Sequence, residues 1–225
     1  MSSWSSRFGS LCALALVAGC HSTPRHVEHS AAQTGATAVA TAGSGAAAHP
    51  GATASVPIPD RAAEQYAEAL KLMKAGKSSD AELELKQLAL AYPEFAGPQV
   101  NLGLLYLRES RFAEAEGAFK AALERNPDNA VASNELGIAE RKLGKFAEAE
   151  AAYQRTIAIE PNYAPAYLNL GVLYDLYLSE PQKALEQFEH YLTLSGDNKQ
   201  VAGWVIELRK RVGASPPAPK KEQPA

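Results

Sequence analysis

The stretch FAEAEAAY, residues 146–153, nearly copies FAEAEGAF, residues 112–119, at a spacing of 34 positions. Other residue types recur in the same phase. They are Pro93, Pro127 and Pro161; Gly103, Gly137 and Gly171, each preceded by a leucine; and Ala81, Ala115 and Ala149. Because three independent residue types keep one period of this length, the sequence predicts an array of repeated structural units.

Each unit is predicted to hold two helices, because two apolar stripes at helical spacing lie within one period. The stripes are Ala132, Leu136, Ala139 and Leu143, and then Phe146, Ala149, Tyr153 and Ile157. Gly144 and Lys145 separate the two helices, and Pro161 ends the second. A single helix pair cannot bury both stripes, so we expect consecutive units to stack.

Glycine in the middle of a helix costs about 1 kcal/mol relative to alanine. We therefore expect a close approach between helices at Gly103, Gly137 and Gly171. The predicted small partners on the second helices are Ala81, Ala115 and Ala149, and the predicted large core side chains are Phe119, Tyr153 and Phe188.

These positions resemble the tetratricopeptide repeat, whose pattern has a small residue, an aromatic residue, Ala, an aromatic residue and Pro at set places. Residues 96–129 supply them as Gly103, Tyr106, Ala115, Phe119 and Pro127. Residues 130–163 depart at Glu140, and residues 164–198 carry one inserted residue before Pro181. The resemblance implies an all-α, right-handed superhelix over residues 60–212. Its units would be residues 62–95, 96–129, 130–163 and 164–198, followed by a capping helix at 199–212.

Composition and charge restrict the function. The chain of 225 residues has a formal net charge of −3 and no basic stripe. Nucleic acid is therefore not an expected partner, since phosphate contacts dominate that affinity. Cys12 and Cys20 are the two cysteines in the sequence, so the repeat region has neither a disulfide framework nor a thiolate metal site.

The start of the chain predicts export. Residues 1–19 combine a short cationic segment with an apolar run that is too short to span a bilayer, which is typical of a signal peptide. The following VAGC, residues 17–20, resembles the lipobox of bacterial lipoproteins. That resemblance implies cleavage before Cys20, lipids on Cys20, and, because His21 rather than Asp follows, anchoring in the outer membrane with the domain in the periplasm. The alternative is an ordinary signal peptide with a cysteine at its end.

Residues 20–59 after the lipid site, and residues 213–225 at the other end, are predicted to be a flexible tether and tail. Both are rich in small residues and proline and have few large apolar side chains. The histidines in the tether are not preorganised for a metal, so they are read as solvated linker.

The resemblance also implies a concave groove lined by the first helix of each unit. Its ligand positions here are Tyr66, Leu70, Met73, Lys74, Val100, Leu104, Leu107, Arg108, Asn134, Ile138, Arg141, Lys142, Leu168, Val172 and Leu176. An exposed apolar surface of this extent predicts a partner helix or peptide. The alternative is that the tether, the tail or the superhelix itself covers these residues. Leu104, Ile138 and Val172 stand where chaperone-binding relatives carry asparagine, which disfavours that binding mode.

We find no pattern for catalysis, and we expect no enzyme activity, cofactor, metal or small-molecule substrate. Gly76-Lys77-Ser78 lacks the first glycine and the preceding strand of a phosphate-binding loop. His190 is the single histidine of the repeat region, and the sequence offers no candidate nucleophile for which it could act as a general base. The sequence therefore predicts a membrane-anchored adaptor for proteins of the cell envelope, for example in a type IV pilus system. The alternatives are a cytosolic co-chaperone and an adaptor for cell-wall hydrolases.

Overall fold

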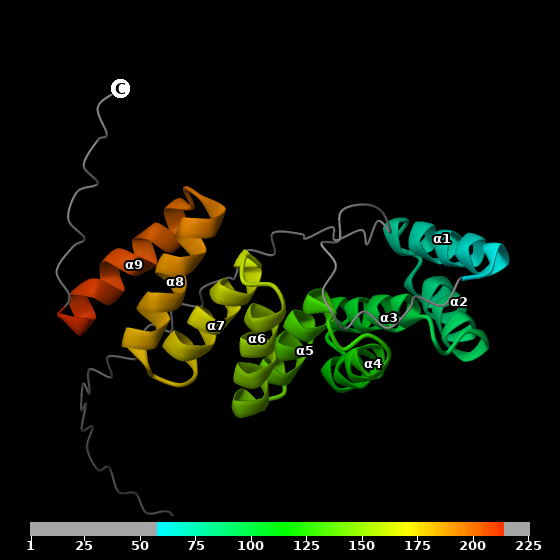
Figure 1. Cartoon of the computed structure of the whole chain (residues 1–225), viewed down its shortest axis with the longest axis horizontal. Helices are drawn as coiled ribbons and strands as arrows, with labels where there is room; N and C mark the ends of the chain where they lie inside the picture. Colours follow the sequence, from blue (N-terminus) through cyan, green and yellow to red (C-terminus); the bar gives the residue numbers. More distant parts are fainter. Residues whose placement is uncertain (1–57, 214–225) are drawn as a thin grey trace, which may run out of the picture. The chain divides into compact units, whose positions relative to one another are not determined.

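The computed structural model describes residues 58–213, and these form nine α-helices in chain order (Figure 1). The helices are α1 (Asp60–Lys74), α2 (Ser78–Ala91), α3 (Ala96–Arg108), α4 (Phe112–Arg125), α5 (Ala130–Lys142), α6 (Phe146–Ile159), α7 (Ala164–Leu176), α8 (Pro181–Ser195) and α9 (Lys199–Val212). The predicted all-α class is confirmed. Pro181 opens α8 in its first turn, where its missing N–H would have no helical partner.

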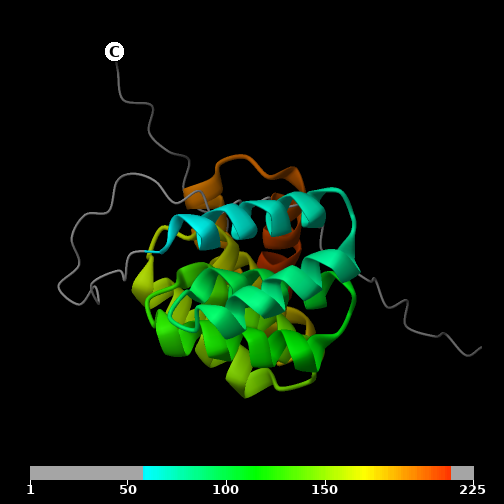
Figure 2. The same cartoon turned by 90° about the vertical axis from the view of Figure 1, so that its right-hand side faces the viewer.

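The helices stack in the order in which they occur in the sequence, and each helix packs against the next one. The first helices of successive pairs also touch, α3 against α5 and α5 against α7. Figure 2 looks along the array from the end that carries α1 and α2. The core accordingly consists of two clusters that meet at α5 and α6, as expected for units that bury apolar surface mainly against their neighbours.

The mid-helix glycines make room for aromatic rings. A Cβ atom at Gly103, Gly137 or Gly171 would lie 2.5 to 2.6 Å from a ring carbon of the second helix in the same pair. The rings belong to Phe119, Tyr153 and Phe188, which are almost completely buried. The predicted large core side chains are therefore confirmed. Ala81, Ala115 and Ala149, the predicted small residues of the second helices, are fully buried.

The first pair reaches the same packing with different residues. Ala69 stands 34 positions before Gly103, and Leu85 stands 34 positions before Phe119. Both side chains are fully buried. Ala69 is larger than the glycine of the other pairs by one methyl group, and Leu85 is smaller than their aromatic residue. The two differences compensate each other, because cores tolerate swaps that conserve volume.

In each of the first three pairs, the turn between the two helices contains one residue in the left-handed backbone conformation. Gly76 and Gly144 have φ of 71° and 76°, and Ser110, midway between them in sequence, has φ of 60°. Glycine adopts this conformation without steric cost, whereas a residue with a Cβ does not. The second pair thus carries a strained serine where its neighbours carry glycine.

Candidate partner-binding surface

The apolar side chains predicted to line the groove are less exposed than the sequence suggested. Met73, Val100 and Val172 are buried. Six others are half-buried and pack against the core: Tyr66, Leu70, Leu104, Leu107, Ile138 and Leu168. Leu176 is 43% exposed. The superhelix therefore covers part of this surface itself, because neighbouring first helices pack side by side.

Three predicted cations form a row on this surface. Lys74, Arg108 and Lys142 are the last residues of α1, α3 and α5, and all three are exposed. None makes an ion pair with another residue in the range 58–213. A cation at the C-terminal end of a helix is favoured by the helix dipole. The charge that remains open to solvent is available to an acidic partner.

Arg141 does not belong to this row, contrary to the prediction. It is 8% exposed, and its guanidinium donates to the hydroxyls of Tyr153 and Tyr177, each over 3.4 Å. The guanidinium also lies 5.6 Å from the ring centroid of Tyr177. A sequence pattern could not separate Arg141 from Lys142, because the two basic residues are adjacent in the last turn of α5.

Asn134 is also placed inside the array and not on an open surface. It is 1% exposed, accepts a hydrogen bond from Asn169 of α7 over 3.0 Å, and donates to Glu135. A similar bond joins α3 to α1, where Asn101 donates to the hydroxyl of Tyr66 over 2.5 Å. Burial raises the pKa of Tyr66 to about 12. These polar contacts tie successive first helices together.

Acidic side chains at one place in the second helices connect each pair to the next. Glu82 of α2 accepts from both outer nitrogens of Arg111, over 2.7 and 3.1 Å, and from the hydroxyl of Tyr106. The hydrogen bonds from Arg111 are the main reason that the pKa of Glu82 falls to about 2. Glu150 accepts from Tyr174 over 2.7 Å in the corresponding place two units later.

The middle junction differs because Glu140 replaces the tyrosine. Glu116 is 8% exposed and accepts from Lys120 over 2.5 Å and from Lys145 over 2.7 Å, which lowers its pKa. The repeated AEAE stretches predict Glu114, Glu116, Glu148 and Glu150 on a solvated outer face. For Glu116 this prediction is wrong. Glu140 is buried, and its Oε2 has no hydrogen-bond partner within the part of the chain that the structure describes. Burial raises the pKa of Glu140 despite Lys120 at 3.5 Å.

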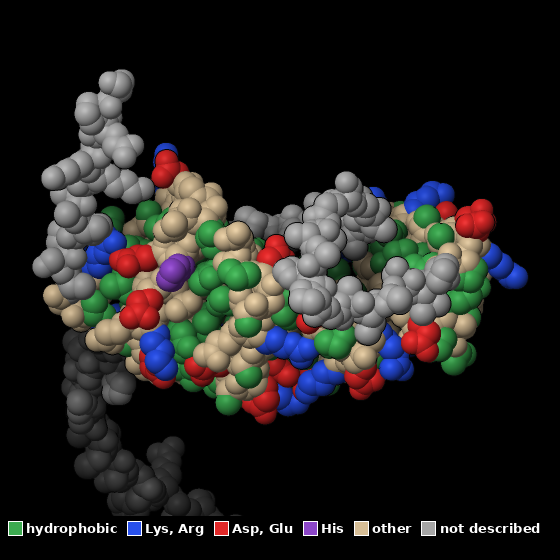
Figure 3. Space-filling model, viewed as in Figure 1, with side chains coloured by type: hydrophobic (Ala, Val, Ile, Leu, Met, Phe, Trp, Pro, Cys, Tyr) green, Lys and Arg blue, Asp and Glu red, His purple; other side chains and the backbone are tan. Residues whose placement is uncertain are grey.

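Charges of both signs are interspersed along the edge of the array that carries α4 and α6 (Figure 3). Glu114 and Glu148 are exposed as predicted, and Glu114 pairs with Arg111. A surface of mixed charge is typical of a solvated face and favours solubility over binding of a highly charged partner.

Residues 58–213 contain no group of three or more His, Cys, Asp or Glu side chains placed to hold a metal. His190 is exposed and stacks on Tyr167 with ring centroids 5.3 Å apart. Among the described helices, none has the length and hydropathy needed to cross a bilayer.

Two hollows lie away from the predicted groove. One, of about 280 Å³, is lined by residues of α1 and α2 and by Tyr92. The other, of about 430 Å³, lies between α8 and α9. None of the predicted groove residues lines either hollow. The sequence did not indicate the second hollow, because residues 199–212 have the pattern of an ordinary amphipathic capping helix.

Comparison with known families agrees with the repeat geometry. The sequence matches the tetratricopeptide repeat over residues 66–130, 100–165 and 134–199, which together span more than half of the chain. The chain therefore belongs to the tetratricopeptide-repeat family. Arrays of this class are protein-binding scaffolds, and no catalytic family is indicated. No curated protein matches the sequence.

Solved structures show the same fold at low sequence identity. The MamA protein is 23% identical with a TM-score of 0.63, over 69% of this chain and 85% of that one. Pseudomonas aeruginosa pilF is 22% identical with a TM-score of 0.61, over 68% and 70%. The first repeat domain of Spaghetti (RPAP3), solved with the HSP90 peptide SRMEEVD, is 22% identical with a TM-score of 0.50, over 53% and 94%. At these identities the similarity concerns the fold.

Proposed function

We propose that this protein is a membrane-anchored adaptor of the bacterial envelope. Its inner row of first helices α1, α3, α5 and α7 would hold an acidic, partly apolar segment of a partner protein. The observation that carries the proposal is the row of Lys74, Arg108 and Lys142. They are exposed at the same place in three successive units and form no ion pair with another residue of the described range 58–213. The apolar part of the contact would come from Leu176 and from the half-buried leucines beside the row.

The three cations of this row imply that the partner segment is negatively charged. Opposite charges across an interface steer encounter and select the partner. The half-buried apolar side chains add affinity when a partner covers them. The structurally similar RPAP3 domain is solved with an HSP90 peptide, SRMEEVD, that contains acidic residues. An extended peptide or an amphipathic helix would fit such a surface equally well.

The envelope location rests on residues that lie outside the described range. The apolar leader, the VAGC stretch and Cys20 support lipid attachment and export, with anchoring at the periplasmic face of the outer membrane. Two or more acyl chains hold a protein firmly at a membrane, whereas one does not. The structural similarity to P. aeruginosa pilF fits an envelope assembly such as a type IV pilus system, which we offer as the process served.

Charge reversal in the row tests the binding surface. A photoreactive amino acid at Leu176 in the full-length protein would report the partner in cells. The double variant Arg108→Glu and Lys142→Glu should lose the crosslinked species. The control variant Arg61→Glu and Lys77→Glu makes the same change in net charge at exposed residues outside the row and should keep it. Equal crosslinking in both variants would rule out this surface.

A further inference from the structure

The last helix, α9, occupies the place of the first helix of a fifth pair. With the one inserted residue of the fourth unit taken into account, Ile206 is equivalent to Gly171, and Ala202 is equivalent to Tyr167. In the earlier pairs these two positions face the second helix of the same pair. Gly171 meets the ring of Phe188 there, and Tyr167 stacks on His190. Within residues 58–213 no helix follows α9 to cover its two positions, and Ile206 is 56% exposed.

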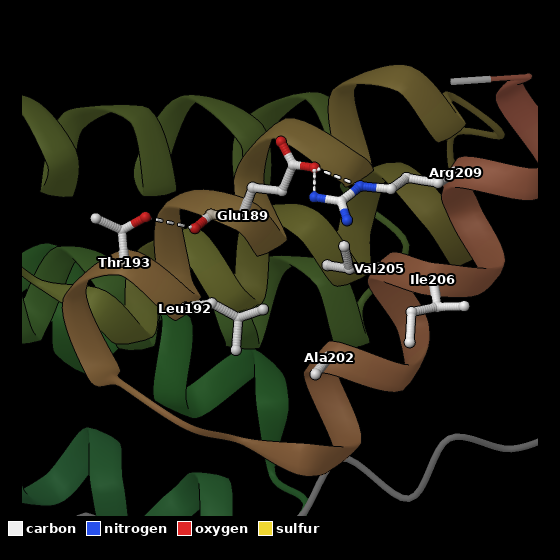
Figure 4. Close-up of a pocket in the computed structure, with 7 residues that line it drawn as sticks. All are labelled: Glu189, Leu192, Thr193, Ala202, Val205, Ile206 and Arg209. Atoms are coloured by element: carbon white, nitrogen blue, oxygen red, sulfur yellow. Dashed lines mark hydrogen bonds and ion pairs between the residues drawn. The ribbon is translucent and has the colours of Figure 1, made fainter. Parts of the chain in front are cut away.

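The uncovered side of α9 forms one wall of the hollow of about 430 Å³ between α8 and α9. Figure 4 shows Leu192 from α8 and Ala202, Val205 and Ile206 from α9 around this space. Arg209 closes one end, with its guanidinium bonded to Glu189 of α8 over 2.6 and 3.0 Å. The hollow thus has an apolar floor and a charged end.

We propose that this hollow is the docking site for one acidic, amphipathic helix of a partner protein. The helix would take the place of the second helix of a fifth pair. This site is separate from the inner row of cations, so it does not depend on the function proposed above.

The shape of the floor determines which residues the partner helix can present. At Gly103, Gly137 and Gly171, a single Cβ atom would already collide with the aromatic ring of the second helix. Isoleucine at position 206 leaves no room for such a ring. The partner helix must therefore place a small residue, such as alanine or glycine, against Ile206, as small residues permit close helix contact.

The charge of α9 determines the polar side of the partner helix. Residues 199–212 carry four basic residues and one acidic residue. Arg209 pairs with Glu189 and Arg211 pairs with Asp175, whereas Lys210 lies 3.8 Å from Glu207 in a pair whose two side chains are largely exposed. Lys210 is exposed, and its position is equivalent to that of Arg141 in α5, which reaches Tyr153 on the second helix of its own pair. A carboxylate at the corresponding place of the partner helix would be within reach of Lys210. The second helices of this chain have the same character, since FAEAEAAY opens α6 with small residues and two glutamates.

Two other occupants fit this surface less well. A second copy would bring two basic α9 helices together, and like charges facing each other disfavour association. The chain's own residues 214–225 contain four prolines and two lysines. That composition does not supply an acidic helix, because proline interrupts helical hydrogen bonding.

A displayed library of single helices, randomised on one face, tests the proposal with the full-length protein as the target. We expect the retained helices to combine a small residue with carboxylates on one face. The variants Ile206→Glu and Lys210→Glu should each weaken their binding by about tenfold or more, as for central interface residues. Leu194→Glu, at an exposed leucine of α8 outside the hollow, is the matched control and should leave binding unchanged.

Several results would overturn the proposal. The proposal fails if the library retains no helix, if it retains basic helices, or if the retained helices bind Ile206→Glu as tightly as the wild type. Sedimentation of the protein alone provides a further check. A wild-type dimer that Ile206→Glu converts to a monomer would show that a second copy occupies the hollow. Loss of binding in Arg108→Glu with Lys142→Glu, but not in Ile206→Glu, would assign the helices to the inner row.

Discussion

The ring of Tyr153 lies directly over the α-carbon of Gly137, so that a methyl group on that carbon would come within 2.6 Å of a ring atom. Tyr153 is fully buried, and its hydroxyl accepts a hydrogen bond from Arg141. The ring cannot move away without breaking this contact. The glycine and the tyrosine therefore form one packing unit, which joins α5 to α6.

Gly137→Ala should destabilise the protein through this contact. Overpacking a filled core costs about 1–3 kcal/mol, which exceeds the ~1 kcal/mol that alanine gains in helix propensity. The free energy of unfolding in urea measures the difference. Gly117→Ala is the matched control, because nothing lies within 4 Å of its added methyl, and it should stabilise the protein. The double variant Gly137→Ala with Tyr153→Leu copies the Ala69 and Leu85 pair and should recover stability relative to the sum of the single changes.

Ser110→Gly should raise the free energy of unfolding by about 1 kcal/mol, because serine at φ 60° is strained and glycine is not. Thermal and urea unfolding both measure this gain. Ser79→Gly, in the helical conformation of α2, should have the opposite sign, since glycine is the poorer helix former. A gain from Ser79→Gly, or a loss from Ser110→Gly, would contradict the assignment of strain to the turn.

Glu82→Gln should weaken the protein at neutral pH and lose its effect in acid. The pKa of Glu82 is lowered from 4.5 to about 2, chiefly by hydrogen bonds from Arg111. Its stabilising contribution is therefore complete above about pH 4.5 and disappears as the pH falls through 2. For a partly exposed ion pair we expect about 1 kcal/mol or less. Urea unfolding of both proteins between pH 7 and pH 2 should show curves that converge in acid, and parallel curves would disprove the linkage.

Glu140→Gln should act in the opposite direction. Burial raises the pKa of Glu140 above 4.5, so its ionised form destabilises the folded protein at pH values above the folded-state pKa. The variant should be more stable at pH 7, by about 1 kcal/mol, the scale of an unpaired buried polar atom. The gain should vanish below pH 4.5, where the carboxyl is protonated in both states. Glu124→Gln, at an exposed residue of α4, should show no such gain.

Cys20→Ala should release the protein from the membrane if the leader directs lipid attachment. Labelling of cells with a fatty acid that carries a detectable tag, followed by membrane fractionation, measures both attachment and retention. Cys12→Ala is the matched control, because Cys12 lies within the predicted leader, and it should leave label and retention unchanged. A wild-type protein in the cytosol, without label, would refute the anchor and favour the co-chaperone alternative.

The class of fold could be predicted from the residues alone, because the residue types that recur in the repeat favour particular local structures. Pro161 ends a helix, Gly144 permits a left-handed turn, and the spacing of Phe146, Ala149 and Tyr153 marks one face of a helix. The packing of Phe119, Tyr153 and Phe188 followed as well, since large residues in phase with glycines leave few other arrangements. These features depend on interactions within one unit or between adjacent helices.

Which polar residues face solvent could not be predicted without the folded arrangement of the helices. Asn134 and Arg141 were expected on an open surface and are buried, and Glu116 was expected in solvent and forms ion pairs between α4 and the turn before α6. The exposure of Ile206 also could not be read from the sequence, where it belongs to an ordinary amphipathic helix. The physical reason is that exposure depends on the neighbouring units, and a helical pattern specifies a face but not what lies against it.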